Sequence, residues 1–383
     1  MNSKGIRIKI FIVTITMLFV ILFTSGCWDA IDINEKQIVT SVVLDYKDEE
    51  IIFYIEIANI DVSSSGASGS SNDDKYIVVE SKGKTLTEAR DNFETKSNKP
   101  IYLSGVRAII ITENFAKKYL IEYLHRFRSD EDYRKKIDTV ITREDPEELF
   151  KIAKERKESV GFVTEEIIKT LDEQGKSFKR TTMRLLENIS TKYTGILVPC
   201  VGIREKDIAI VGYSVVHDNT VDGFLPAEDI EGMIFLKAKK PKMDYRIPYK
   251  DMNITLEVEL KKRKIVPHYD NGQITFDVNM KYKALLLYGD KKEPYDFQIE
   301  DQSAVAEILR KKLKEELFDA VKRAQNEFSC DYYQFDDEFR VKYPIEFDRM
   351  NWEEEFPKII TNYNLKVSVS TEWMMDYSNN ETK

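Results

Sequence analysis

Apolar and polar residues alternate with strand periodicity soon after the apolar N-terminal segment of the chain. Two β-rich runs, "KQIVTSVVLDY" at 36–46 and "EIIFYIEIANI" at 50–60, are joined by a short acidic turn. Two such runs separated by a tight turn predict a β-hairpin. The next run, at 61–74, is rich in Ser and Gly and can bury little, so we expect a mobile loop there.

Strand-like and helical patterns then alternate. The strands are "KYIVVE", "GVRAIIIT" and "IDTVIT". Thr85 and Glu88 have the spacing of a capping box, which predicts that a helix begins there. Asp145 and Pro146 predict a second helix start, and the helical pattern continues to Gly175. A further helix over 113–127 places four apolar side chains on one face: Phe115, Tyr119, Leu120 and Leu124.

These elements predict one N-terminal α+β domain at residues 27–178. Residues 179–250 contain the β-like runs "TGILVPCVGI" and "IAIVGYSVVHDNTVDGFL", a turn at Asp218–Asn219 and a short helix after Pro226. We therefore expect a middle, β-rich domain at 179–250.

The last segment has the clearest pattern. Two alternating runs, "NITLEVELKKRKIV" and "QITFDVNMKY", flank Asn271–Gly272, which suits a tight hairpin turn. A long amphipathic helix is expected over 301–326, and "NYNLKVSVS" predicts a closing strand. Antiparallel strands backed by a helix predict a β-β-α-β layer at 251–375, followed by a flexible tail at 376–383. The fold class is thus α+β, with several domains of mixed, mostly antiparallel sheets packed with helices.

The first 26 residues have the layout of a bacterial secretory signal. Lys4, Arg7 and Lys9 precede an apolar run, and the small residues Ser25 and Gly26 precede a cysteine. The run is shorter than the roughly 20 apolar residues of a spanning helix, which favours cleavage over a permanent anchor.

Cys27 follows that run in the sequence "TSGC", which resembles a lipobox, although Thr24 stands where Leu is usual. The lipobox predicts that the Cys27 thiol receives a diacylglycerol and becomes the new N-terminus. Each buried methylene contributes about 0.8 kcal/mol, so two or three acyl chains would hold the protein on the outer face of a membrane. A secreted protein with an incidental cysteine and an uncleaved membrane anchor are the alternatives.

Composition narrows the class of partner. The 383 residues carry a net charge of −9, and residues 1–26 contain only positive charges, so the remainder is more acidic still. An acidic body argues against nucleic acid as a partner and against spreading on anionic lipid.

Candidate chemistry is sparse. Cys200 and Cys330 can be buried free thiols or, less favourably, a disulfide, and the three histidines lie far apart without metal-ligand spacing. The acidic runs at 336–338 and 353–355 are expected on solvated faces, and the basic run "KKRK" at 261–264 at a solvated strand edge. We therefore predict no catalytic residue, no metal site and no cofactor, and a binding or assembly role.

Four blocks of the chain resemble the Ger(x)C family, the lipoprotein C subunits of bacterial spore germinant receptors. They are "GCWDAIDINEKQIVTSVVLDY", "LSGVRAIIITENFAKKYLIEYLHRFRSDEDYRKKIDTVIT", "VGYSVVHDNTVDGFLPAEDIEGMIFLK" and "DYYQFDDEFRVKYPIEFDRMNWEEEFPKIITNYNLKVSVS". The last block includes Asp331, Phe335, Pro344, Trp352 and Phe356. The family tends to have Gly around that Phe, whereas here Gln334 and Asp336 flank it, so the backbone turn there is expected to differ.

The resemblance implies a three-domain fold, acylation of Cys27 and residence on the outer leaflet of the spore inner membrane. It also implies a complex with two integral-membrane subunits, A and B. This complex responds to small nutrients by triggering ion release. The alternatives are a lipid-anchored solute-binding protein, which would show two similar α/β lobes, and an anchored envelope hydrolase, which would need a nucleophile–base or metal set.

Overall fold

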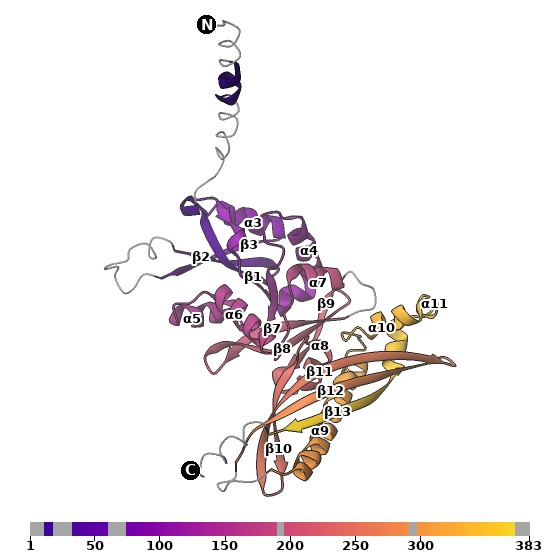
Figure 1. The fold of residues 1–383 in the computed structure, drawn as a ribbon. Coiled ribbons are helices and arrows are strands. Elements are labelled where there is room, and N and C mark those ends of the chain that lie inside the picture. Colours follow the sequence, from indigo (N-terminus) through magenta and orange to yellow (C-terminus); the bar gives the residue numbers. More distant parts are fainter. Residues whose placement is uncertain (1–10, 18–32, 60–73, 190–194, 291–296, 372–383) are drawn as a thin grey trace, which may run out of the picture.

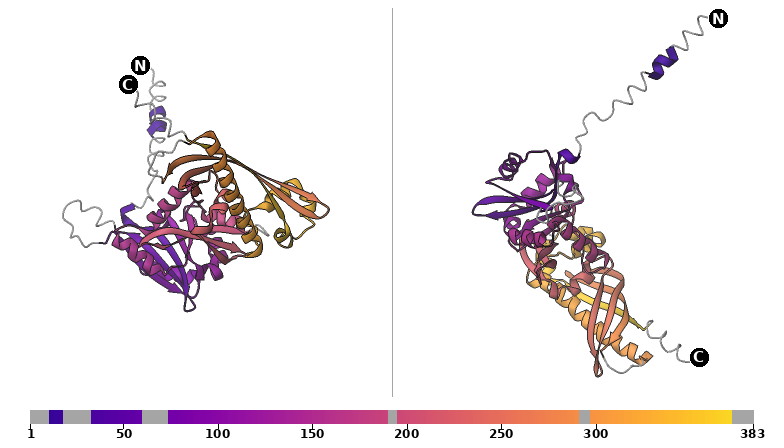
Figure 2. Two further views of the ribbon diagram at one scale, coloured as in Figure 1. Left: turned by 90° about the horizontal axis from the view of Figure 1, so that it is seen from below. Right: turned by 90° about the vertical axis from the view of Figure 1, so that its left-hand side faces the viewer.

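The protein is built on two β-sheets that lie end to end (Figure 1). The computed structural model describes residues 11–17, 33–59, 74–189, 195–290 and 297–371. The two further views in Figure 2 show the same arrangement, with the N-terminal sheet at one end and the C-terminal sheet with its long helix at the other. The α+β fold class expected from the sequence is confirmed.

The larger sheet has nine strands, eight of them in the order β3-β2-β1-β5-β6-β7-β8-β9, with β4 paired to β1. Strands β1, β5, β6 and β7 run parallel in the middle, and antiparallel pairs extend the sheet at both ends. The expected hairpin is confirmed as β1 and β2. The strands are β1 (Gln37–Lys47), β2 (Glu50–Ala58), β3 (Tyr76–Gly83), β4 (Ile101–Tyr102), β5 (Ala108–Thr112), β6 (Asp138–Thr142), β7 (Ile196–Arg204), β8 (Asp207–His217) and β9 (Thr220–Pro226).

Helices cover both faces of this sheet. One apolar cluster lies beneath α3 (Leu86–Glu94), α4 (Glu113–Ser129) and α7 (Thr182–Ile189), and another beneath α5 (Pro146–Glu155) and α6 (Val160–Glu173). The expected start of α3 is confirmed, because the Thr85 hydroxyl accepts a hydrogen bond from the Glu88 amide.

The helical pattern from Asp145 to Gly175 is interrupted in the structure. Lys157 has a φ of 57°, which ends α5, and Ser159 caps a new helix, α6. The carboxylate of Glu56 on β2 also meets the start of α6, where it accepts hydrogen bonds from the Val160 amide (2.9 Å) and the Ser159 hydroxyl. A helix N-terminus binds a carboxylate well because its first amides have no intrahelical acceptor.

The smaller sheet has the order β10-β11-β12-β13 and carries α9 (Ile299–Asn326) on one face. The turn at Asn271–Gly272 is confirmed, with positive φ at both residues, and β13 lies parallel to β12 as the closing strand. The strands are β10 (Lys242–Tyr249), β11 (Met252–Asp270), β12 (Gln273–Gly289) and β13 (Ile360–Ser370). Shorter helices are η1 (Ile33–Glu35), η2 (Leu103–Gly105), η3 (Ala227–Asp229), α8 (Glu231–Lys237), α10 (Phe335–Lys342), α11 (Pro344–Phe347), α12 (Trp352–Glu355) and η4 (Phe356–Lys358).

The segment expected as a middle domain, residues 179–250, is divided between the two sheets. Strands β7, β8 and β9 extend the N-terminal sheet, whereas β10 is the first strand of the C-terminal sheet. Within the described residues this segment therefore has no sheet of its own. The physical reason is the parallel pairing of β6 with β7, which joins the middle strands to the preceding sheet.

Helix α8 joins the two sheets through one shared core. That core contains Leu197, Tyr213 and Leu225 of the first sheet together with the inward residues of the second sheet and of α9. Five consecutive residues of α8, 232–236, are buried. A Cβ placed on Gly232 would lie 2.2 Å from the carbonyl oxygen of Glu316, so only glycine permits this approach of α8 to α9.

We predict that Gly232→Ala destabilises the protein by about 1–3 kcal/mol, because backbone of α9 blocks the added methyl group. Urea unfolding followed by circular dichroism measures the change. Gly289→Ala is the matched control, since its added Cβ would meet first the flexible side chain of Met252, at 3.2 Å. Equal stability of wild type and Gly232→Ala would contradict the proposed close packing.

Candidate functional site

A cavity of about 440 Å³ opens beside the N-terminal sheet. Its floor is apolar, formed by Val42 of β1, Phe53 and Ile55 of β2 and Phe93 of α3. Its rim is polar and consists of Arg90, Glu94, Ser97, Asn98, Lys99 and Asp132, with Pro100, Ile101, Leu103 and Tyr133 completing the wall. Cavities of this size that combine an apolar floor with a few polar groups are typical of small-molecule sites.

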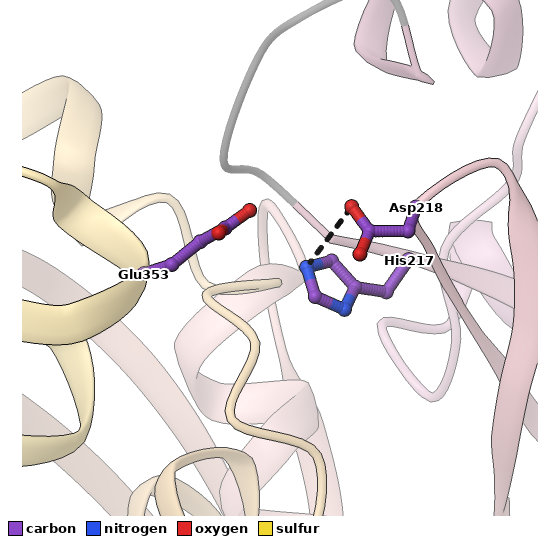
Figure 3. A group of neighbouring side chains, drawn as sticks. All are labelled: His217, Asp218 and Glu353. Carbon is purple, nitrogen blue, oxygen red and sulfur yellow. Dashed lines mark ion pairs between the residues drawn. The ribbon is translucent and has the colours of Figure 1, made fainter.

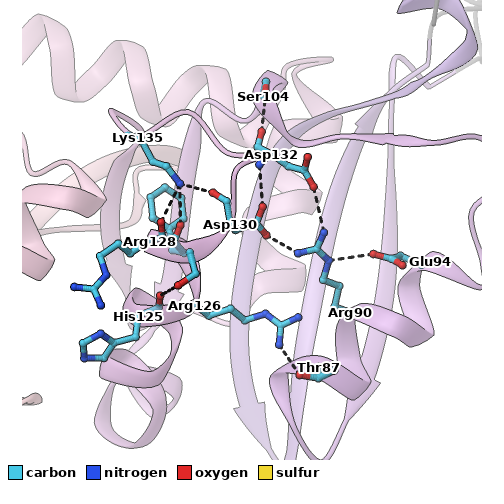
Figure 4. Close-up of polar contacts among 12 residues, drawn as sticks. Thr87, Arg90, Glu94, Ser104, His125, Arg126, Arg128, Asp130, Asp132 and Lys135 are labelled. Carbon is cyan, nitrogen blue, oxygen red and sulfur yellow. Dashed lines mark hydrogen bonds and ion pairs between the residues drawn. The ribbon is translucent and has the colours of Figure 1, made fainter. Parts of the chain in front are cut away.

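Arg90 is the charged centre of the rim (Figure 4). Its guanidinium donates to Glu94 (3.0 Å), to Asp130 (2.5 Å) and to Asp132 (3.4 Å). Burial lowers the pKa of Arg90, but the hydrogen bond to Glu94 and the charge of Asp130 outweigh it, and the pKa is raised above its ordinary value. Since three carboxylates surround one guanidinium, the cluster favours a cation or a hydrogen-bond donor over an anion.

The loop that carries Asp130 and Asp132 is fixed to the end of α4. The Lys135 ammonium donates to the Phe127 carbonyl (3.3 Å), the Arg128 carbonyl (3.2 Å) and the Asp130 carbonyl. A cation at the C-terminal end of a helix binds the last carbonyls and complements the helix dipole. The Ser104 hydroxyl donates to the Asp132 carbonyl at 2.7 Å, which ties the same loop to η2 (Figure 4).

A second cluster joins the two sheets at the turn between β8 and β9 (Figure 3). His217 and Asp218 at this turn meet Glu353 of α12, and one ligand atom of each lies within 4.8 Å of the others. His217 Nε2 is 3.8 Å from the Asp218 carboxylate and makes no hydrogen bond within the described residues. These three side chains are the set in the described part of the chain that could hold a metal ion. Sequence spacing could not find them, because Glu353 is remote from His217.

A third cluster lies inside the C-terminal block. Asp331 is buried, and one of its oxygens accepts hydrogen bonds from the Trp352 indole (3.0 Å) and the Asp336 amide (2.8 Å). Gln334 has a φ of 65°, the left-handed conformation that glycine adopts most readily, and its amide oxygen accepts from Lys237 at 2.7 Å. The turn expected to differ at Phe335 therefore keeps a left-handed residue without glycine, and the side chain of that residue binds α8.

The acidic run at 336–338 was expected on a solvated face. This expectation is wrong for Asp336, which is buried. Burial, and then the charge of Asp331, raise the pKa of Asp336 to about 7. The "KKRK" run is also not simply a solvated edge. Arg263 points inward and donates to the carbonyls of Phe235 (2.7 Å) and Ala238 (3.1 Å) at the end of α8.

The predicted lipidation residue, Cys27, lies outside the described residues, so acylation stays a prediction. Cys200 and Cys330 are both buried and free. Burial raises the pKa of the Cys200 thiol to about 12 and that of Cys330 above its ordinary value, which makes both poor nucleophiles. Within the described part of the chain, no helix is long and apolar enough to span a membrane.

The described residues form an α+β protein in which two helix-packed sheets share one core, with a cavity beside the first sheet. The sequence profile described as "Spore germination protein N-terminal domain" matches residues 29–203, and that described as "Spore germination B3/GerAC like, C-terminal" matches residues 211–372. The chain belongs to the Ger(x)C family of spore germination proteins.

Similarity to individual proteins extends over almost the whole chain. Spore germination protein B3 of Bacillus subtilis (strain 168) is 21% identical over 361 residues, which are 92% of this chain and 96% of that protein. Spore germination protein KC of the same organism is 21% identical, covering 90% and 91%. The crystal structure of the GerBC protein superposes with a TM-score of 0.58 at 18% identity, covering 86% of this chain and 96% of that one, which shows a common fold.

We predict that Arg90→Met destabilises the protein by about 1–3 kcal/mol, because Asp130, which is mostly buried, loses its cation. Arg90→Lys should recover part of the loss, since an ammonium keeps the charge but not the fork of donors. Thermal unfolding measures both. The control, Arg184→Met, removes an exposed arginine whose ion pair among the described residues is with Glu187 on its own helix, and it should change stability little. Similar losses in both arginine variants would contradict the assignment.

Asp336 predicts a pH dependence of stability. Because its pKa is higher in the folded chain than its ordinary 3.8, the folded state holds the proton more tightly, and this stabilisation is lost as the pH rises from about 4 through about 7. Asp336→Asn should remove that slope, so the variant gains stability relative to wild type as the pH rises. Urea unfolding from pH 4 to 8 measures the difference. Asp337→Asn, at a partly exposed neighbour, is the control, and parallel curves for wild type and Asp336→Asn would refute the prediction.

Proposed function

We propose that this Ger(x)C chain is a non-enzymatic, lipid-anchored subunit of a spore germinant receptor. In this proposal Cys27 carries the acyl chains, and the folded body lies on the outer face of the spore inner membrane. It assembles there with two integral-membrane subunits, A and B, and the complex is needed for nutrient-triggered germination. The single observation that carries the proposal is the match of both family domains across the body, directly after an apolar segment that ends in "TSGC".

We propose that the physical role of the lipid anchor is to raise the effective concentration of this protein near its membrane-embedded partners. A protein confined to a membrane surface meets membrane-embedded partners at a far higher effective concentration than a freely diffusing one. Two acyl chains suffice for stable attachment, so the acidic body needs no further affinity for lipid.

The geometry of the described residues supports binding rather than catalysis. The cavity beside the sheet is lined by one serine, Ser97, whose hydroxyl donates to Gln37 (2.8 Å) and to a backbone carbonyl and has no general base as partner. A lipid-anchored solute-binding protein is the alternative, and the cavity of about 440 Å³ favours it. Against it, the two sheets differ in strand number and order and do not form two similar lobes.

We expect intact-mass spectrometry of the protein from a detergent-extracted membrane fraction to show cleavage before Cys27 plus a diacylglyceryl group. Cys27→Ala should lose the added lipid mass and leave the membrane fraction. Affinity capture of the anchored protein should then recover two integral-membrane proteins. A chain that keeps residues 1–26, or a cleaved chain without lipid, would refute the anchor, and capture without membrane subunits would refute the complex.

A further inference from the structure

The C-terminal sheet has one face that no described segment covers. Inward side chains of its strands, such as Leu256, Val278 and Leu365, pack toward α9 and the shared core. The outward positions of the three long strands are all exposed or partly exposed. A sheet needs burial on only one face, so this outer face is free to carry residues chosen for another purpose.

Lysines occupy the middle of that outer face. Lys262 of β11 lies directly opposite Lys281 of β12, which lies directly opposite Lys366 of β13. Lys264 follows two residues along β11 on the same face. We call these four residues the lysine row. Like charges in directly opposite positions destabilise a sheet, so folding alone does not explain the row.

Neighbouring acids do not neutralise the lysine row. Glu257 is paired with Lys242, and Glu259 with Lys261. Within the described residues, none of the four lysines has a carboxylate within ion-pair distance. The four cations therefore stand unpaired among the described residues, on a chain whose net charge is −9.

The lysine row lines a groove of about 610 Å³. Next to the row, the Asn364 side chain donates to the Asn279 side chain at 3.2 Å, and both residues line the groove. Arg310 of α9 also lines the groove and is itself paired with Glu307. The groove thus presents ammonium groups and amides along three strands.

We propose that this groove binds an acidic, extended segment of a partner polypeptide. Alternate residues of an extended chain are separated by about 6.6–6.8 Å, the same spacing as Lys262 and Lys264 along β11, so two alternate carboxylates match these two lysines. Lys281 and Lys366 lie beside them on the neighbouring strands and add positive charge to the same groove. A bilayer surface fits less well, because the row lies in a groove and the acidic body is repelled by anionic lipid. The proposal does not depend on the lipid anchor.

The test uses the full chain in detergent and a short fluorescein-labelled poly-glutamate peptide as the probe, measured by fluorescence anisotropy at low salt. Lys281→Glu combined with Lys366→Glu should weaken binding at least about tenfold, and added salt should weaken wild-type binding. Lys311→Glu combined with Lys314→Glu makes the same charge change on the exposed side of α9 and should alter affinity less than about twofold.

Each other outcome overturns the proposal. Equal loss in both double variants would mean that the peptide responds to net charge alone, and absence of wild-type binding would leave the groove without this ligand class. Displacement of the peptide by dihexanoyl phosphatidylglycerol at a lower concentration than by unlabelled peptide would assign the row to lipid headgroups. Melting temperatures check that a loss of binding is not a loss of folding. The double change makes the pair at 262 and 281 attractive but leaves like charges opposite each other at 281 and 366, so the Lys281/Lys366 variant should be about as stable as wild type.

Discussion

The close packing of α8 against α9 is the constraint from which the rest of the arrangement follows. Helix α8 lies in the short connection between the last strand of one sheet and the first strand of the other, and five of its seven residues are buried in succession. A helix so short has little stability of its own, so its position is set by what surrounds it. Gly232 lets its backbone reach that of α9, and the shared core then holds the two sheets as one body.

Polar contacts at the far end of α8 complete the joint. Arg263 reaches its terminal carbonyls from β11, and Gln334 accepts a hydrogen bond from Lys237. The backbone of Gln334 is left-handed, and this residue lies directly before the first turn of α10 as its N-cap. The Asp331–Trp352 hydrogen bond holds the other side of that turn. Residues of this C-terminal block therefore hold the junction between the two sheets. This structural role accounts for their burial without any catalytic role.

The local pattern of apolar, capping and turn residues predicted most individual helices and strands. Contacts between residues far apart in the sequence decided how these elements are placed and which polar side chains are buried. The hairpins at 47–50 and 271–272, the Thr85 cap and the long helix depend on residues adjacent in sequence, so they could be predicted. Placement of β7 depends on two residue pairs with β6. The environment of buried Asp336 depends on Asp331, which accepts hydrogen bonds from the Asp336 amide and from Trp352. The Arg90 carboxylates come from α3 and from the loop after α4, and Glu353 meets His217 across the joint. No spacing rule relates Arg90 to Asp130, or His217 to Glu353.

A single irregularity in β11 explains why the basic run could not be interpreted from sequence alone. The register shifts between Leu260 and Lys262, so one extra residue enters the strand and the inward positions change from even to odd numbers. Without that bulge Arg263 would point outward and the lysines flanking it inward. With it, Arg263 reaches α8, and Lys262 and Lys264 join Lys281 and Lys366 on the open face. The same bulge thus secures the joint between the sheets and creates the cationic groove.

The groove and the carboxylate-rich rim near Arg90 lie on different sheets and differ in charge. A partner that touched both would need opposite charges at two separated places, and such complementarity fixes orientation more strongly than affinity. In the proposed receptor subunit, this division of charge between the two sheets would fix the orientation of a partner that contacts both.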